Sequence, residues 1–228
     1  MTEIISRATI YLGDKRGCTQ SNGYRSFHTF NFGNYQNEHR KGYGSLTAFN
    51  DETLVAKSSI VHGVVEDGMV LLIPIVGGIE FEIKEGDRSF IEAGESVLFS
   101  VTKGCTLEIA NPLNDEPVNF VSAWFSPDVF SPDLNTQSVF NLDDQKDSLI
   151  HLFSFRSIEG RLGMFSGRKD AAYELQNYSG ALFAFVIEGA FEFQNRLLES
   201  RDGLLLLNVQ RVEFEALSSD AIVLLLEV

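Results

Sequence analysis

Histidine, cysteine and acidic side chains are the residues of this 228-residue chain that could bind a metal ion or transfer a proton. The chain contains only four histidines and two cysteines, beside 32 aspartates and glutamates. It has no Gly-x-Ser-x-Gly elbow, no phosphate-binding loop and no Cys-x-x-Cys pair. Local motifs therefore give no sign of a serine hydrolase, a nucleotide-binding protein or a zinc knuckle.

The surroundings of three histidines favour structural or solvated roles. His28 lies between phenylalanines and is expected to be a packed or hydrogen-bonded strand residue. His39 lies in a polar loop and is expected to be solvated, and nothing near His151 pairs with it. The glutamates that alternate with apolar residues predict solvated strand faces, not acid/base pairs. These are Glu80, Glu82, Glu192, Glu213 and Glu215.

Short β-strands are the elements expected to position these residues. The 19 phenylalanines and 19 glycines combine strand formers with turn formers. Residues 70–76 form an apolar run, and residues 79–83 alternate apolar and acidic side chains, which is typical of a half-buried strand. Further strands are expected at 97–101, 106–110 and 119–125. The one expected helix covers Leu142 to Leu152, because two aspartates lie near its start.

The second half of the chain repeats the pattern of the first. Residues 182–193 (LFAFVIEGAFEF) match residues 71–82 (LLIPIVGGIEFE), and in both halves a turn glycine then leads into another apolar strand. This internal duplication predicts two small antiparallel barrels in tandem. Residues 126–141 carry two Ser-Pro-Asp triplets and are expected to link the barrels. We therefore expect an all-β protein with domains at 1–130 and 131–228.

Composition limits the partners and the compartment. The formal net charge of −14 repels phosphate backbones and argues against direct nucleic-acid binding. The longest apolar run contains a proline and two glycines and is too short for a membrane span of about 20 residues. The N-terminus lacks the features of a secretion signal, and two distant cysteines make no disulfide framework. A cytoplasmic protein is expected.

The segment Ser26 to Tyr35 (SFHTFNFGNY), with Gly23 before it and Gly42-Tyr43-Gly44 after it, resembles the N-terminal signature of the pirin family. The strand ending at Gly78, the turn at 92–95 and the pair at 111–112 extend the likeness. The resemblance implies a bicupin, with two tandem cupin barrels of jelly-roll type. It also implies that a His-x-His pair and a His-x-Glu pair hold an iron-type ion in the N-terminal barrel. Some members of the family have quercetinase activity, and others act in transcriptional regulation.

The implied ligand positions do not carry metal ligands in this chain. They fall on Val64, Glu66, Leu107 and Ile109, of which three are aliphatic and offer no lone pair. A displaced cluster of His62, Glu66 and Glu108 is an alternative, but a one-residue slip would turn strand side chains to the opposite face. Cys105 precedes the third position and either borders the barrel mouth or packs as a small hydrophobe. We expect no metal and no other cofactor.

The sequence therefore favours a pirin-like bicupin without a functional metal site, which binds a small apolar ligand or a protein partner and is non-catalytic. One alternative is a quercetinase-type metal-dependent dioxygenase that uses a displaced site, for which His62 is the residue to test. A second alternative is a redox-responsive regulator acting through Cys18 or Cys105.

Overall fold

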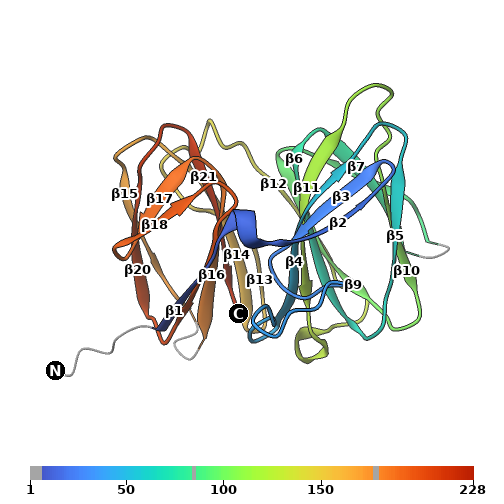
Figure 1. The fold of residues 1–228 in the computed structure, drawn as a ribbon, viewed down its shortest axis with the longest axis horizontal. Helices are drawn as coiled ribbons and strands as arrows, with labels where there is room; N and C mark the ends of the chain where they lie inside the picture. The colour runs from blue at the N-terminus through green and yellow to red at the C-terminus, as the bar shows by residue number, and fades with distance from the viewer. Residues whose placement is uncertain (1–6, 84–85, 177–179) are drawn as a thin grey trace. The chain divides into compact units, whose positions relative to one another are not determined.

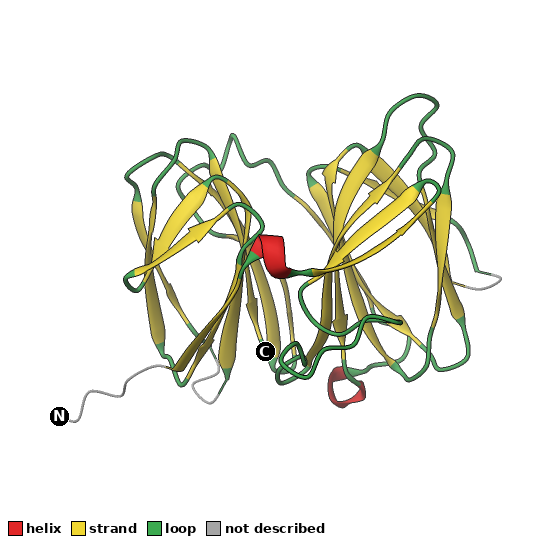
Figure 2. Cartoon of the chain, viewed as in Figure 1, coloured by secondary structure: helices red, strands yellow, loops and turns green. Residues whose placement is uncertain are grey.

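The computed structural model describes residues 7–83, 86–176 and 180–228. Within these residues the chain forms 21 β-strands and two short 3-10 turns, η1 (Gly13–Lys15) and η2 (Pro127–Val129). Figures 1 and 2 show that strands make up almost all of the regular structure. The predicted all-β class with two tandem cupin barrels is confirmed.

The chain divides into two compact units. The N-terminal unit is Arg16–Phe140, and the C-terminal unit combines Asn141–Val228 with the described part of the first 15 residues. The boundary expected between residues 130 and 131 falls inside the N-terminal unit, because β12 (Asn135–Val139) pairs with β9 (Glu95–Val101). The expected linker therefore contributes a strand to the first barrel.

The N-terminal unit is built from a seven-stranded and a four-stranded antiparallel sheet. The larger sheet has the strand order β12-β9-β6-β11-β4-β3-β2, and the smaller has the order β5-β10-β7-β8. Besides β9 and β12, the strands of this unit are β2 (Gly17–Ser21), β3 (Tyr24–His28), β4 (Leu46–Leu54), β5 (Ser59–Gly63), β6 (Gly68–Val76), β7 (Gly78–Ile83), β8 (Ser89–Glu92), β10 (Thr106–Ala110) and β11 (Val118–Phe125). The five strands expected between residues 70 and 125 are all present.

The C-terminal unit repeats this plan with a six-stranded and a four-stranded sheet. Their strand orders are β1-β19-β16-β21-β14-β13 and β15-β20-β17-β18. The strands are β1 (Arg7–Tyr11), β13 (Ile150–Phe155), β14 (Ile158–Phe165), β15 (Asp170–Glu174), β16 (Ala181–Glu188), β17 (Ala190–Phe193), β18 (Arg196–Glu199), β19 (Gly203–Leu207), β20 (Arg211–Ala216) and β21 (Ala221–Glu227). The first strand among the described residues, β1, thus belongs to the second barrel, where it pairs with β19.

The prediction of a helix from Leu142 to Leu152 is wrong. The Asn141 side chain accepts hydrogen bonds from the amides of Asp143 and Asp144, which closes a local turn. Asp147 then takes a left-handed conformation with φ of 62°, and β13 begins at Ile150. A left-handed residue cannot continue a right-handed helix, so the acidic start of this segment makes turns instead.

Both units pack an apolar cluster and also bury polar side chains. In the C-terminal unit the rings of Phe165, Phe191, Phe193 and Phe214 pack against one another, and the buried Glu227 accepts a hydrogen bond from Tyr173. The N-terminal unit has a comparable apolar cluster and buries more polar side chains, several of which lie on β3, β4 and β11. In the part of the chain that the structure describes, no helix is long and apolar enough to cross a membrane.

Candidate functional site

The central strand β4 carries three consecutive buried polar residues, Asn50, Asp51 and Glu52. Side chains alternate between the two faces of a strand. Asn50 and Glu52 therefore share the face of Leu54, which belongs to the apolar cluster of the barrel interior, and Asp51 lies on the opposite face. Polar residues in the middle of a buried strand need partners on both faces.

Glu52 is fully buried, and neutral donors surround its carboxylate. The hydroxyls of Tyr24 on β3 and Ser122 on β11 donate hydrogen bonds to it. Nε2 of His62 on β5 lies 3.7 Å from Oε2 of Glu52, an ion-pair contact longer than a hydrogen bond. Burial alone would raise the pKa of Glu52, but the contacts with His62, Ser122 and Tyr24 outweigh it and lower the pKa. Glu52 is therefore a buried carboxylate at neutral pH.

The same carboxylate affects its tyrosine partner. Burial is the first cause that raises the pKa of the Tyr24 phenol, and the negative charge of Glu52 is the second. Tyr24 therefore keeps its proton and remains a hydrogen-bond donor to Glu52.

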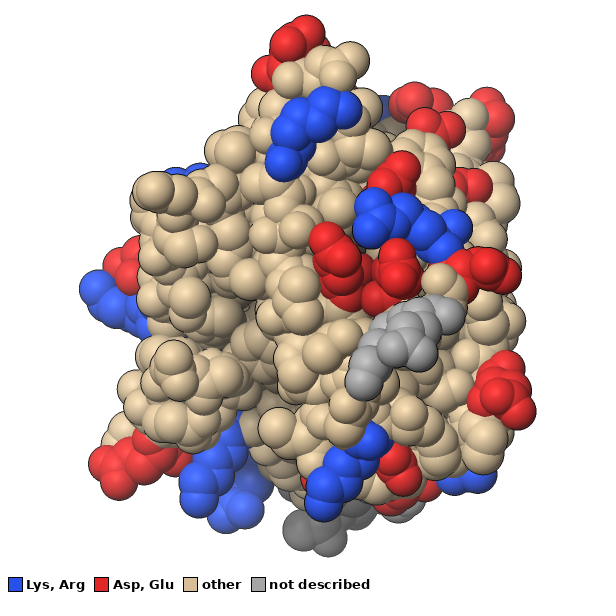
Figure 3. Space-filling model, turned by 90° about the vertical axis from the view of Figure 1, so that its right-hand side faces the viewer, with Lys and Arg blue, Asp and Glu red and all other residues tan. Residues whose placement is uncertain are grey.

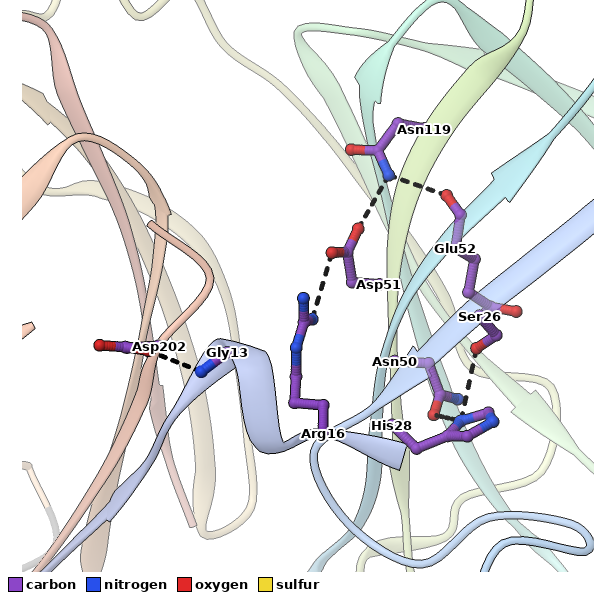
Figure 4. Close-up of polar contacts among 9 residues, drawn as sticks. All are labelled: Gly13, Arg16, Ser26, His28, Asn50, Asp51, Glu52, Asn119 and Asp202. Carbon is purple, nitrogen blue, oxygen red and sulfur yellow. Dashed lines mark hydrogen bonds and ion pairs between the residues drawn. The ribbon is translucent and has the colours of Figure 1, made fainter. Parts of the chain in front are cut away.

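A chain of hydrogen bonds connects Glu52 to His28. The Asn50 side-chain amide donates to Ser122 Oγ at 3.2 Å, and Asn50 Oδ1 accepts from His28 Nδ1 at 2.7 Å. Because Oδ1 can only accept, Nδ1 carries the proton, and Nε2 accepts from the Thr19 hydroxyl at 2.8 Å. Burial lowers the pKa of His28, so the ring is neutral. Figure 4 shows the bonds of His28 to Asn50 and Ser26.

The other face of β4 carries a separate polar cluster. Asp51 accepts hydrogen bonds from Arg16 at 3.1 Å and from Asn119 at 2.8 Å (Figure 4). The side chains of Arg16 and Asp51 are only 5% and 8% exposed. In the C-terminal unit, Asp202 accepts a hydrogen bond from the Gly13 amide. These contacts are structural, because each charged group is paired by the protein itself.

A cavity of about 450 Å³ adjoins the Glu52 cluster. His62, Trp124 and Phe32 line it, and their ring centroids lie 5.4 to 5.7 Å apart. His62 Nε2 and Trp124 Nε1 are buried and have no hydrogen-bond partner among the described residues. The lining includes Glu66 and Asp67 but no lysine or arginine. The cavity therefore combines an aromatic wall with an acidic margin, and two of its lining side chains each carry a buried nitrogen without a hydrogen-bond partner.

Two of the implied metal-ligand positions, Val64 and Glu66, line the same cavity as His62, and Leu107 pairs with His62 across β10 and β5. Val64, Leu107 and Ile109 are buried in the apolar cluster of the barrel, and Glu66 is exposed at the cavity. Aliphatic side chains cannot coordinate a metal ion, so these residues do not fit the iron-type centre that the resemblance implies. Within the described residues, no group of three or more histidine, cysteine or acidic side chains could hold a metal ion.

The structure does not assemble the displaced cluster. His62 and Glu66 both line the cavity, but Glu108 lies on the outer face of β10, where it pairs with Arg88 at 3.6 Å. Arg88 also pairs with Glu80 and Glu82 at 3.2 Å each. Figure 3 shows small charged groups of this kind, separated by broad uncharged areas, on one face of the molecule.

The remaining cysteines and histidines considered from the sequence lie outside the Glu52 cluster. Cys105 is half-buried against the apolar cluster, and Cys18 is exposed on β2. His39 is exposed beside Glu38, and His151 is exposed on β13. No covalent or ligating role follows from these positions.

The residues at the centre of the site were not predicted from the sequence; they are Tyr24, Asn50, Glu52, Ser122 and Trp124. One usable signal was the polar run at 50–53, which lies between Phe49 and Leu54 without a glycine or proline to mark a loop. Such a run predicts buried polar groups once the segment is recognised as a strand. The partners on β3, β5 and β11 depend on strand pairing, which the sequence alone does not specify.

Three comparisons with known proteins bear on this site. Residues 159–228 match the family model described as "Quercetinase C-terminal cupin domain". A relative from Escherichia coli strain K12, named quercetin 2,3-dioxygenase, is 26% identical over 121 residues, which are 52% of this chain and 52% of the relative. The match thus spans about half the length of this curated relative.

Solved structures resemble the chain over nearly its whole length. Escherichia coli YhhW superposes with a TM-score of 0.85 at 19% identity, covering 97% of both chains. The complex of bacterial pirin YhhW with nickel(II), also from Escherichia coli, gives 0.82 at 20% identity, covering 97% of this chain and 99% of the other. A quercetin 2,3-dioxygenase from Acinetobacter baumannii gives 0.72 at 10% identity, covering 97% and 78%. At these identities the likeness establishes the fold.

Proposed function

We propose, from the premise that the chain belongs to the pirin-like cupin family, that its N-terminal barrel binds a small planar aromatic molecule without a metal ion. The observation that carries the proposal is the cavity beside His62, Phe32 and Trp124. Its volume is within the range of small-molecule sites, and its walls combine aromatic rings with a few polar groups, as such sites commonly do.

The chemistry of the lining indicates the ligand. A flat ring can stack against or meet the edges of Phe32, His62 and Trp124. An unpaired buried N–H is costly, so an oxygen of the ligand that accepts from Trp124 Nε1 would stabilise the complex. The relatives named above act on quercetin, a planar polyphenol that carries such oxygens. Quercetin is therefore the first ligand to test, in the absence of metal.

The single tryptophan makes the test direct. Trp124 is the only tryptophan of the chain and lines the cavity, so its fluorescence should report occupancy. We expect quercetin to quench this fluorescence saturably in protein treated with chelator, after correction for absorption by the ligand. Phe32→Ala should weaken binding about tenfold, the equivalent of about 1.4 kcal/mol. The same substitution at Phe90, which is exposed on β8, should leave binding unchanged.

Metal analysis of the same samples separates this proposal from its main alternative. Elemental analysis after incubation with iron, manganese, copper or nickel salts and desalting should show no stoichiometric retention. Retention of one equivalent, or quenching that requires added metal, would overturn the proposal. Absence of saturable quenching would also overturn it.

A quercetinase-type, metal-dependent dioxygenase is the second candidate. It is favoured by the names of the relatives and by the nickel(II) complex of one structural neighbour. This candidate predicts oxygen uptake with quercetin that depends on loaded metal. Unchanged oxygen levels after metal loading, measured with an oxygen electrode, would remove it.

A further inference from the structure

We propose a further activity that rests on the binding site proposed above: His62 and Glu52 form a metal-independent acid–base dyad that interconverts the keto and enol forms of a neutral ketone that carries an aromatic ring. His62 lines the cavity, and the carboxylate of Glu52 lies behind it at 3.7 Å. In such a pair, the carboxylate orients the imidazole and stabilises the imidazolium that forms when the ring accepts a proton.

The position of Glu52 requires a positive partner. Its carboxylate is fully buried, and its hydrogen-bond donors Tyr24 and Ser122 are neutral hydroxyls. Among the described residues, no lysine or arginine makes an ion pair with it, and Nε2 of His62, which is charged only when the ring is protonated, lies 3.7 Å away. A buried charge is stabilised best by an opposite charge in contact with it. Protonation of His62 by a substrate therefore creates the ion pair for which this arrangement is preorganised.

Other ionisable groups around His62 do not take this role. From β3, Tyr24 meets the His62 ring edge-to-face, and His28 is a neutral ring held by Asn50 and Thr19. Glu66 and Asp67 are at the margin of the cavity. Glu52 on β4 is the one acidic group that the structure places in ion-pair contact with His62 among the described residues.

The reaction is a balanced proton transfer with no oxidant or reductant. Nε2 of His62 faces Glu52, so Nδ1 takes the proton from the carbon next to the carbonyl group, and the electron pair of that C–H bond forms the carbon–carbon double bond of an enolate. The carbonyl π pair moves to the oxygen, which accepts a hydrogen bond from the unpaired Trp124 Nε1–H. The imidazolium then returns its proton to the oxygen to give the enol, or to carbon to regenerate the ketone.

The cavity also selects the substrate class. Its lining contains acidic residues and no lysine or arginine, which disfavours carboxylates and phosphates. The aromatic wall of Phe32, His62 and Trp124 favours a ring attached to the reacting group. A neutral ketone fused or attached to an aromatic ring fits both conditions.

Hydrogen exchange provides the test. The α-hydrogens of 2-tetralone, a neutral ketone whose ring is fused to a benzene ring, exchange with D₂O, and proton NMR can follow this exchange in the presence of chelator-treated full-length protein. We expect saturable exchange well above the buffer rate. His62→Gln should lower the maximal rate about 10²- to 10⁴-fold, the usual contribution of a general base. His151→Gln makes the same change at an exposed histidine of the other unit and should have no effect.

Glu52 is a positioning residue, and its test compares rate with binding. Glu52→Gln should lower the maximal exchange rate by at least tenfold while the dissociation constant, read from Trp124 fluorescence, changes little. A purely structural role would alter both quantities together. Because Glu52→Gln and His62→Gln change different elements, misfolding of one variant, visible by circular dichroism, leaves the other to decide.

Each outcome is decisive. Exchange at the buffer rate despite quenching by 2-tetralone would overturn the dyad and leave the proposed binding function intact. No quenching by 2-tetralone would overturn the assigned substrate class, and quercetin binding would still be judged by its own titration. Exchange that survives unchanged in both correctly folded variants would place the activity elsewhere and refute the inference.

Discussion

Replacing Tyr24 by phenylalanine tests whether Glu52 is a buried carboxylate held by hydroxyl donors. The phenol of Tyr24 donates directly to the carboxylate, and both side chains are buried. A hydrogen bond to a charged group contributes about 1.5–3 kcal/mol, and its loss leaves a buried acceptor without a partner. We expect Tyr24→Phe to lower the free energy of unfolding by about 2 kcal/mol at neutral pH, which corresponds to a melting temperature roughly 5–10 °C lower.

Urea unfolding followed by Trp124 fluorescence is the suitable assay, because the only tryptophan lies in the same unit as Glu52. A double-mutant cycle with Glu52→Gln isolates the pair. We expect a coupling free energy of about 1–2 kcal/mol, since the two groups are in direct contact.

The pH dependence has a defined sign. The folded-state pKa of Glu52 is lowered, so its contribution is fully present above its unfolded pKa of about 4.3 and is lost as the pH falls through the folded value. Tyr24→Phe removes one cause of the lowering. The difference between wild type and variant should therefore be largest near neutral pH and should shrink in acid. A loss below about 0.5 kcal/mol, or zero coupling in the cycle, would refute the assignment of a charged Glu52 held by Tyr24.

Two further predictions concern residues outside the cavity. Arg16→Ala should destabilise the protein by about 3–5 kcal/mol in urea unfolding, because it leaves the Asp51 carboxylate without the guanidinium that it contacts at 3.1 Å. Lys15→Ala, at a well-exposed ion pair, is its control and should stay within about 0.5 kcal/mol; equal effects would contradict the buried-pair argument. Native Cys18, which is exposed, should react with a maleimide faster than the half-buried Cys105, as peptide mass spectrometry can measure. If mild peroxide leaves both thiols unmodified, the redox-regulator hypothesis fails.

The fold was largely predictable because it follows from local periodicity. Alternation at 79–83, the apolar run at 70–76 and the repeated segment at 182–193 each predict strands without any knowledge of their partners. The error at 142–152 arose from local chemistry, since Asn141 can accept hydrogen bonds from the turn as readily as it can cap a helix.

The site was predictable only in part because it depends on contacts between distant strands. His62 is the one histidine of the displaced cluster considered from the sequence, and it lines the cavity. Its carboxylate partner Glu52 was not identified, because strand register decides which polar residues meet across the barrel. Tyr24 and Ser122 reach Glu52 only because β3 and β11 flank β4 on either side.

The pairing of β1 with β19 delays the assembly of the second barrel during translation. β1 is translated before β19, so its pairing partner exists only after residues 203–207 have been made. The N-terminal unit, which is translated in the interval, can fold before β1 has a strand to pair with. A fragment beginning at residue 141 would leave the edge of β19 that pairs with β1 open to pairing between molecules. Division of the gene between residues 15 and 16 would therefore separate a strand from its barrel, and a circular permutant that joins β1 to the C-terminal half would keep them together.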